Sequence, residues 1–147
     1  MRLVVAIGGN ALLKRGDTLG IGEQRRNMGE AADMLAALSR EHEVVLVHGN
    51  GPQVGLLALE AEAYKGAPPY PLDVLGAESQ GMIGYVIEEA MRRALPDREI
   101  VTVLTQTLVD PADPAFAKPS KPIGPVYDES TARALAAERG WAVAAEG

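Results

Sequence analysis

The sequence contains no cysteine, only two histidines and no long run of apolar residues. Without cysteine, the chain has no disulfide, no thiolate nucleophile and no cysteine-ligated metal. His42 and His48 are too few for a metal site built from histidine. No segment approaches the roughly 20 apolar residues that a membrane-spanning helix needs, and the first residues lack the features of a secretory signal. These absences predict a cytoplasmic protein with no membrane partner and no metal site of its own.

Basic residues are the scarcer charge. The 14 lysines and arginines face 20 aspartates and glutamates, which gives a net charge of -6. Non-specific binding to nucleic acid needs a basic face, so the balance argues against a nucleic-acid partner. Any anionic ligand must therefore be held by local groups. The length of 147 residues suits one ordinary domain, and 47% apolar residues suffice for a core.

Two short apolar segments, residues 4–7 and 44–48, each run into a loop of glycine and asparagine. The loops contain Gly8, Gly9 and Asn10 in the first and Gly49, Asn50, Gly51 and Pro52 in the second. Glycine lets the backbone approach a ligand closely, and unpaired N–H groups at a helix start attract phosphate or carboxylate. Neighbouring parallel strands present their loops at one edge of a sheet. We therefore expect both loops to bind one small anion, chiefly through main-chain amides.

The remaining pattern predicts an α/β protein. Helical periodicity covers residues 28–38, 52–61 and 78–95, and residues 100–104 are apolar on both faces, as in a buried strand. The order strand, helix, strand, helix, helix, strand predicts a three-layer α/β/α sandwich with a mainly parallel sheet.

A proline-rich excursion then interrupts the regular pattern. Five prolines within residues 110–127 exclude a regular helix, and the segment is expected to form a protruding lid. Asp128 has the character of an N-cap, with a helix to Arg139 that Gly140 stops. Residues 141–145 are predicted to start another strand. A strand with so little chain after it leaves a sheet edge or face uncovered, so we expect the sequence to be part of a longer protein.

Three other functional motifs are excluded because the spacing or the position of their residues does not match. Gly49, Gly51 and Gly55 approach a dinucleotide-binding fingerprint, but the spacing is wrong and a proline interrupts it. Lys14 is neither preceded by glycine nor followed by serine or threonine, as a Walker loop requires. Ser79 does not follow a strand, so it is not a nucleophile elbow. A nicotinamide-dependent enzyme is thus the weaker alternative to an anion-binding protein.

Two lysines stand among the prolines of the excursion. Lys118 and Lys121 are compact charges on long stems, and a restricted backbone would carry them over a bound anion. The alternative is that both are solvated surface lysines.

Several stretches resemble the carbamate kinases, a branch of the amino acid kinase family. They are VAIGGNAL (5–12), HGNGPQVG (48–55), PLDV (71–74) with GAESQGMIGY (76–85), and DPAF (113–116) with KPIGP (121–125). They occur in the family's order and cover almost the whole chain. Other branches carry a lysine two residues before the paired glycines, where this chain has Ala6, which counts against an aspartate, glutamate or uridylate kinase.

The resemblance implies reversible phosphoryl transfer between ATP and carbamate, giving ADP and carbamoyl phosphate, with Mg²⁺. It also implies a homodimer that works in arginine metabolism. In the implied mechanism, lid lysines replace the missing charge, with Lys121 as the catalytic residue and Lys118 as a substrate-binding residue.

Family members are roughly twice as long and keep their nucleotide-binding lobe in the C-terminal half. The resemblance therefore implies that residues 1–147 form the N-terminal carbamate- and carbamoyl-phosphate-binding lobe, inactive alone, with the lid at about 110–127. The alternative is a non-catalytic anion-binding or regulatory module of the same fold.

Overall fold

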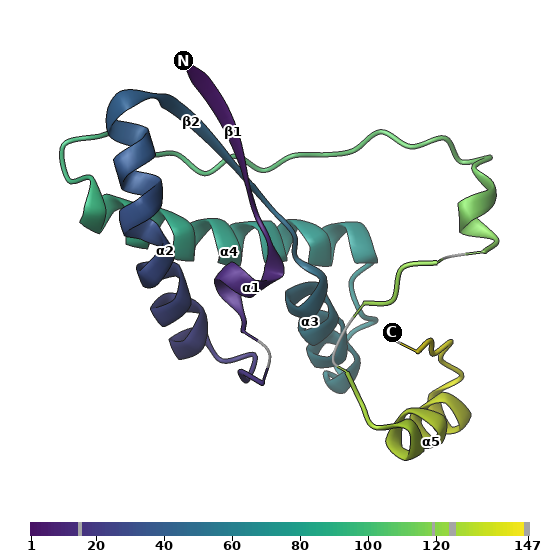
Figure 1. Ribbon diagram of the computed structural model, residues 1–147. Coiled ribbons are helices and arrows are strands. Elements are labelled where there is room, and N and C mark those ends of the chain that lie inside the picture. Colours follow the sequence, from purple (N-terminus) through teal and green to yellow (C-terminus); the bar gives the residue numbers. More distant parts are fainter. Residues whose placement is uncertain (15, 119, 124–125, 146–147) are drawn as a thin grey trace.

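The structure is a computed structural model that describes residues 1–14, 16–118, 120–123 and 126–145, apart from the side chains of residues 9 and 10. Its elements in chain order are β1 (Arg2–Ile7), α1 (Gly9–Leu12), α2 (Ile21–Glu41), β2 (Glu43–His48), α3 (Gly51–Ala63), α4 (Leu72–Ala94), the 3-10 helix η1 (Pro114–Phe116) and α5 (Glu129–Arg139) (Figure 1). Strands that alternate with helices and pair in parallel confirm the predicted α/β class. None of the helices in the described ranges combines the length and apolar character needed to cross a bilayer.

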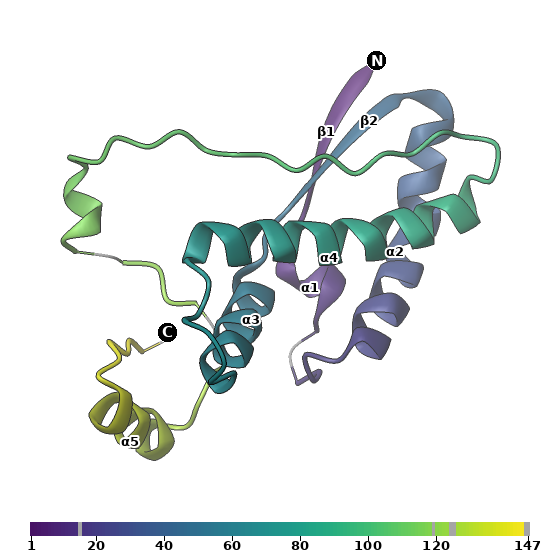
Figure 2. The same ribbon diagram turned by 180° about the vertical axis from the view of Figure 1, so that it is seen from behind.

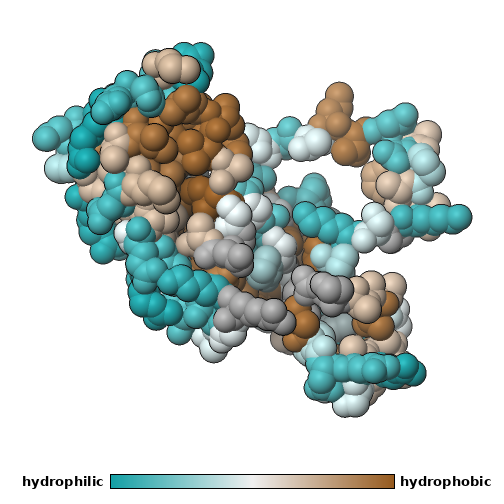
Figure 3. Space-filling model, viewed as in Figure 1, coloured by the Kyte–Doolittle hydropathy of each residue, from teal (hydrophilic) through white to brown (hydrophobic). Residues whose placement is uncertain are grey.

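The sheet that the structure describes consists of β1 and β2, paired in register from Arg2 with Glu43 to Ile7 with His48. Burial alternates along both strands, so every second side chain faces the helices. The opposite face carries Val4, which is 70% exposed. Figure 3 shows apolar side chains gathered over the two strands on this side. Within the described residues, the third layer of the predicted sandwich is therefore not formed.

The core lies between the covered face of the sheet and the helices α2 and α4, which pack against each other. Its buried residues include Ile7, Leu12, Met28, Ala32, Leu35, Ile83, Val86, Ile87, Ala90 and Met91. The apolar stripes predicted for residues 28–38 and 78–95 supply most of them. Burying each large aliphatic side chain stabilises the fold by about 1.5–3 kcal/mol.

Prolines lie at the N-terminal boundaries of α3 and α4. Pro52 lies in the first turn of α3, where its missing N–H is not needed, as the sequence predicts. In contrast, α4 begins at Leu72, earlier than the predicted residue 78. Pro71 acts as its N-cap with φ of -66°, so the proline cluster initiates this helix.

The prediction of a strand at residues 100–104 is wrong for the structure described. This segment is extended but has no strand beside it, and it runs along α4 (Figure 2). Gln80 of α4 accepts from Thr105 N at 2.8 Å and donates to Thr105 O at 3.2 Å. A Cβ on Gly84 would collide with the side chain of Thr102, so the glycine permits this close approach. Side chains of α4 thus replace the hydrogen bonds that a strand would supply.

The C-terminal part confirms one helix and contradicts one strand. Asp128 caps α5 by accepting from Thr131 N at 2.9 Å, and Gly140 ends it with φ of 68°, both as predicted. Hydrogen bonds from Ser130 and then from Thr131 hold the pKa of the Asp128 carboxyl well below its usual range. The predicted strand at 141–145 is irregular in the structure. Without a described neighbour, it has no ladder to join.

Candidate functional site

The two glycine loops lie side by side. Ile7 and His48 are the last paired residues of β1 and β2, so Gly8 and Gly49 leave the sheet at the same edge. The chain turns into α1 at Gly9 after the first strand and into α3 after the second (Figure 1). Parallel register therefore brings two strand-to-helix turns together.

The folded chain does not itself require glycine in these loops. Among the described residues, only Gly16 and Gly140 have a positive φ. A Cβ added at Gly8, Gly49 or Gly51 would meet no atom within 4 Å. The space beside the loops is therefore open, and a ligand can approach the backbone there.

The start of α3 has main-chain donors that make no hydrogen bond to any residue the structure describes. Asn50 is its N-cap, but the Asn50 side chain makes no capping hydrogen bond. The first bond of the helix runs from Val54 N to Asn50 O at 2.9 Å. Gly51 and Gln53 therefore present N–H groups with no acceptor inside the helix. Together with the helix dipole, these groups form a positive end suited to an anion.

His48 stabilises the shape of the second loop. Its Nδ1 lies 3.1 Å from Gly49 O, and because a carbonyl oxygen only accepts, Nδ1 carries the proton. The ring is half-buried and bonds the neighbouring residue. This contact supports an orienting role for His48.

A set of buried polar side chains lies behind the second loop. Asn50 Nδ2 donates to Ser79 Oγ at 2.7 Å, and Gln53 Nε2 donates to Gln24 Oε1 at 3.2 Å. Ser79 is fully buried, and Gln24 and Gln53 are nearly so. Satisfied buried networks hold their members in one arrangement. This role does not follow from any sequence motif; its one indication is that the polar residues stand on helix faces that are otherwise apolar.

A second polar cluster ties the segment after α1 to α2. Asp17 Oδ2 accepts from Asn27 Nδ2 at 2.6 Å and from Lys14 N at 3.0 Å. The Asn27 hydrogen bond, then the Lys14 amide, lower the pKa of the Asp17 carboxyl below its ordinary value of 3.8. Asn27 also donates to Leu12 O at 3.1 Å. These bonds hold the far end of the first loop and of α1.

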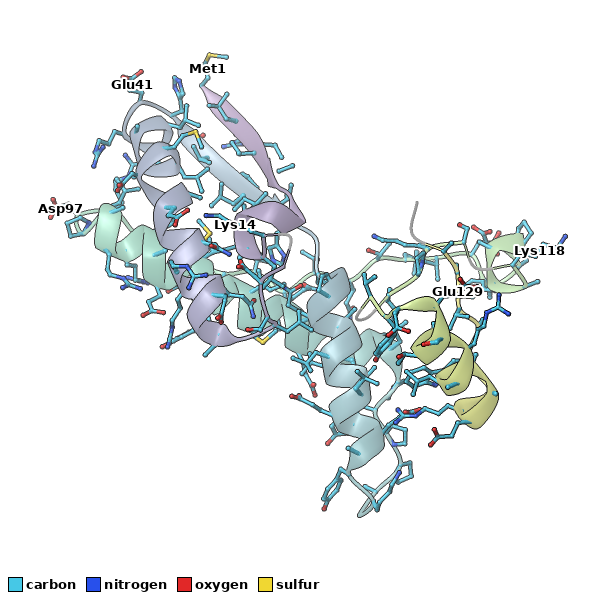
Figure 4. The ribbon with its side chains drawn as sticks, turned by 60° about the horizontal axis from the view of Figure 1, so that its bottom comes forward. Met1, Lys14, Glu41, Asp97, Lys118 and Glu129 are labelled. Carbon is cyan, nitrogen blue, oxygen red and sulfur yellow. The ribbon has the colours of Figure 1, made fainter. Side chains whose placement is uncertain are left out.

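The structure does not bring Lys118 to the glycine loops. Figure 4 places Lys118 on the outer part of the excursion, with its side chain directed away from the body. Lys118 and Lys121 are exposed, and neither forms an ion pair within the described ranges. The side chain of Asn10 lies outside the described residues. A lid that closes over the loops thus remains a prediction.

A hollow in the surface lies away from the glycine loops. It has a volume of about 430 Å³ and is lined by the starts of both strands, including Met1, Arg2 and Glu43, and by Glu41. Figure 4 shows Met1 and Glu41 at this end of the sheet. Since the glycine loops follow the opposite ends of the strands, this hollow is not part of the site. The described residues also contain no group of three or more His, Cys, Asp or Glu side chains able to hold a metal ion.

Comparisons with known proteins point to one family. The sequence model described as "Amino acid kinase family" matches residues 1–130. The carbamate kinase of Rhizobium meliloti (strain 1021) is 50% identical over 148 residues, which cover 100% of this chain and 46% of that protein. The carbamate kinase of Escherichia coli (strain K12) is 52% identical over 145 residues, which cover 99% of this chain and 49% of the relative.

A solved structure agrees with these sequence matches. The carbamate kinase from Giardia lamblia bound to citric acid superposes with a TM-score of 0.85 at 40% identity, covering 94% of this chain and 46% of the other. The chain thus spans about half the length of the relatives it matches.

Proposed function

The chain belongs to the amino acid kinase family, and on that premise we propose that it forms the substrate-binding half of a carbamate kinase. In the proposed reaction, a carbamate oxygen attacks the γ-phosphorus of ATP, the bond to the bridging oxygen breaks, and ADP leaves with the electron pair. The products are ADP and carbamoyl phosphate, and the reaction is reversible. The protein's part in such a transfer is positioning and charge stabilisation.

One observation carries the proposal: the pairing of Ile7 with His48 places both glycine loops at one edge of the sheet. Carbamate and the transferred phosphoryl group are small and anionic, and the open space beside the loops suits them. In this proposal the substrate is bound by Gly8, Gly9, Asn10, Gly49, Asn50, Gly51 and Lys118. Lys121 supplies the catalytic positive charge when the lid of residues 110–127 closes.

The nucleotide is assigned to a second lobe. Residues 1–147 supply the carbamate lobe, and ATP or ADP binds to a C-terminal lobe of the complete protein. A divalent metal accompanies ATP in kinases, and we propose Mg²⁺. Since the described residues form no metal cluster, an ion held chiefly by nucleotide phosphates fits this chain best. Assembly as a cytoplasmic homodimer and a place in arginine metabolism belong to the same proposal and depend on the family resemblance.

The test is ATP formation. The protein from the complete reading frame should convert ADP and carbamoyl phosphate to ATP, and the 147-residue chain alone should not. No ATP formation by the complete protein would reject the kinase and leave the anion-binding or regulatory module. Turnover by the 147-residue chain would reject the division into two lobes. Saturable, tight NADH binding, followed by fluorescence, would favour the nicotinamide alternative.

A further inference from the structure

Ser79 makes a contact that sets the direction of the Asn50 side chain. Its hydroxyl donates to Gly76 O at 2.7 Å and accepts from Asn50 Nδ2, also at 2.7 Å. A hydroxyl has one proton, so a serine whose proton goes to a carbonyl can only accept from a second partner. The amide nitrogen of Asn50, and not its oxygen, must therefore face Ser79. This contact is enclosed, because Ser79 is 0% exposed.

The direction matters because Asn50 is the N-cap of α3. An asparagine at this position normally turns its side-chain oxygen onto the N–H of the second or third helical residue. The second residue here is Pro52, which has no N–H, so Gln53 N is the one available donor. The structure shows no such cap. A capping oxygen would put negative partial charge at the helix end and occupy its donor.

We propose that Ser79 is a positioning residue that prevents Asn50 from capping α3 and so keeps the helix start open to the substrate anion. The role in catalysis rests on the proposed function, whereas the competition for Gln53 N does not. A serine that only satisfied its own hydrogen bonds in the core would have no effect on that donor. A positioning role and a purely structural role for Ser79 therefore predict different behaviour of the Gln53 amide.

The first experiment uses the 147-residue chain and needs no activity. In Ser79→Ala, Asn50 loses its acceptor and its oxygen caps α3, so hydrogen exchange at the Gln53 amide should slow by about tenfold relative to the unchanged chain. In Ser79→Ala/Asn50→Gly the cap is absent, and exchange should return to the original rate. Equal Gln53 exchange in the unchanged chain and Ser79→Ala would overturn the proposal, as would slow exchange that persists in the double variant.

The second experiment uses the complete protein with ADP and carbamoyl phosphate. Ser79→Ala should raise the KM for carbamoyl phosphate by about tenfold, the value of one hydrogen bond to a charged group, with a smaller change in kcat. The double variant should recover part of this loss. Ser39→Ala is the matched control, because it removes another buried helix hydroxyl, bonded to Leu35 O at 2.8 Å, without touching Asn50.

These outcomes separate the two proposals. If the unchanged protein forms no ATP, the proposed function fails, and Gln53 exchange still decides the role of Ser79. If the unchanged protein is active and Ser79→Ala keeps its KM, or Ser39→Ala raises KM equally, the positioning role is wrong and the kinase proposal stands.

Discussion

Replacing Gly49 with alanine adds one methyl group in the space beside the second glycine loop. No described atom lies within 4 Å of that position, and Gly49 lacks the left-handed φ that disfavours alanine. The folded chain therefore accepts the methyl group without strain. Loss of glycine also restricts the unfolded chain, which stabilises the protein by about 0.4–1 kcal/mol. For a chain of this size we expect the melting temperature to rise by up to about 3 °C.

Activity should change in the opposite direction. The added methyl group stands where the proposal puts the substrate anion and holds it away from the loop amides. Removing one preorganised donor from such a site lowers the rate by about 100- to 1,000-fold. We therefore expect Gly49→Ala in the complete protein to lose at least about 100-fold in kcat/KM with ADP and carbamoyl phosphate.

Gly29→Ala is the matched control for this experiment. Gly29 lies on an exposed part of α2, and a Cβ there also meets nothing within 4 Å. Its substitution should stabilise the helix by about 1 kcal/mol and leave kcat/KM unchanged. Thermal unfolding and ATP formation should be measured on both variants. Unchanged kcat/KM in Gly49→Ala, or a lowered melting temperature, would show that this space is not reserved for the substrate.

Three further predictions concern charge and core. Lys121→Ala should lower kcat of the complete protein with no change in melting temperature, since the exposed side chain adds little to the core; unchanged kinetics would remove it from the mechanism. Ile83→Ala should lower the free energy of unfolding by about 2–5 kcal/mol, measured by urea unfolding, because Ile83 is fully buried. A smaller loss would mean that neighbouring side chains close the space left by the isoleucine. Because the folded pKa of Asp17 lies below 3.8, its contribution to stability is constant at neutral pH and falls as pH drops below about 4. Asp17→Asn should flatten this acid-induced loss in melting temperature, and an unchanged slope would contradict the assignment.

Features encoded by neighbouring residues could be predicted from the sequence. The cap at Asp128 and the stop at Gly140 depend on contacts within one turn, and the structure has both. The two strands and their parallel pairing follow from apolar runs that end in glycine loops. The apolar stripe of α2 likewise follows from helical spacing.

Features that depend on contacts between residues far apart in the chain could not be predicted from the sequence. The bond from Asn50 to Ser79 joins residues 29 positions apart, and no spacing rule connects an N-cap to a serine on another helix. The sequence position of Ser79 excludes a nucleophile elbow, but it does not reveal the hydrogen bonds that Ser79 makes to Asn50 and Gly76. Lys118 and Lys121 could be named as charges in a lid, but the path of the backbone between prolines sets where they lie.

The incorrect strand at residues 100–104 and the open face of the sheet have one physical origin. Alternation or continuity of apolar residues predicts which faces are buried, but it does not specify the layer that buries them. Val4 is 70% exposed on the sheet, and Val101 is 80% exposed on the extended segment. Both carry the β-branched side chains of a covered strand, while the described residues supply no covering layer. Next to this segment, Gln80 of α4 pairs with the backbone of Thr105 and so supplies two of the hydrogen bonds that a neighbouring strand would make, while the apolar side chains stay uncovered.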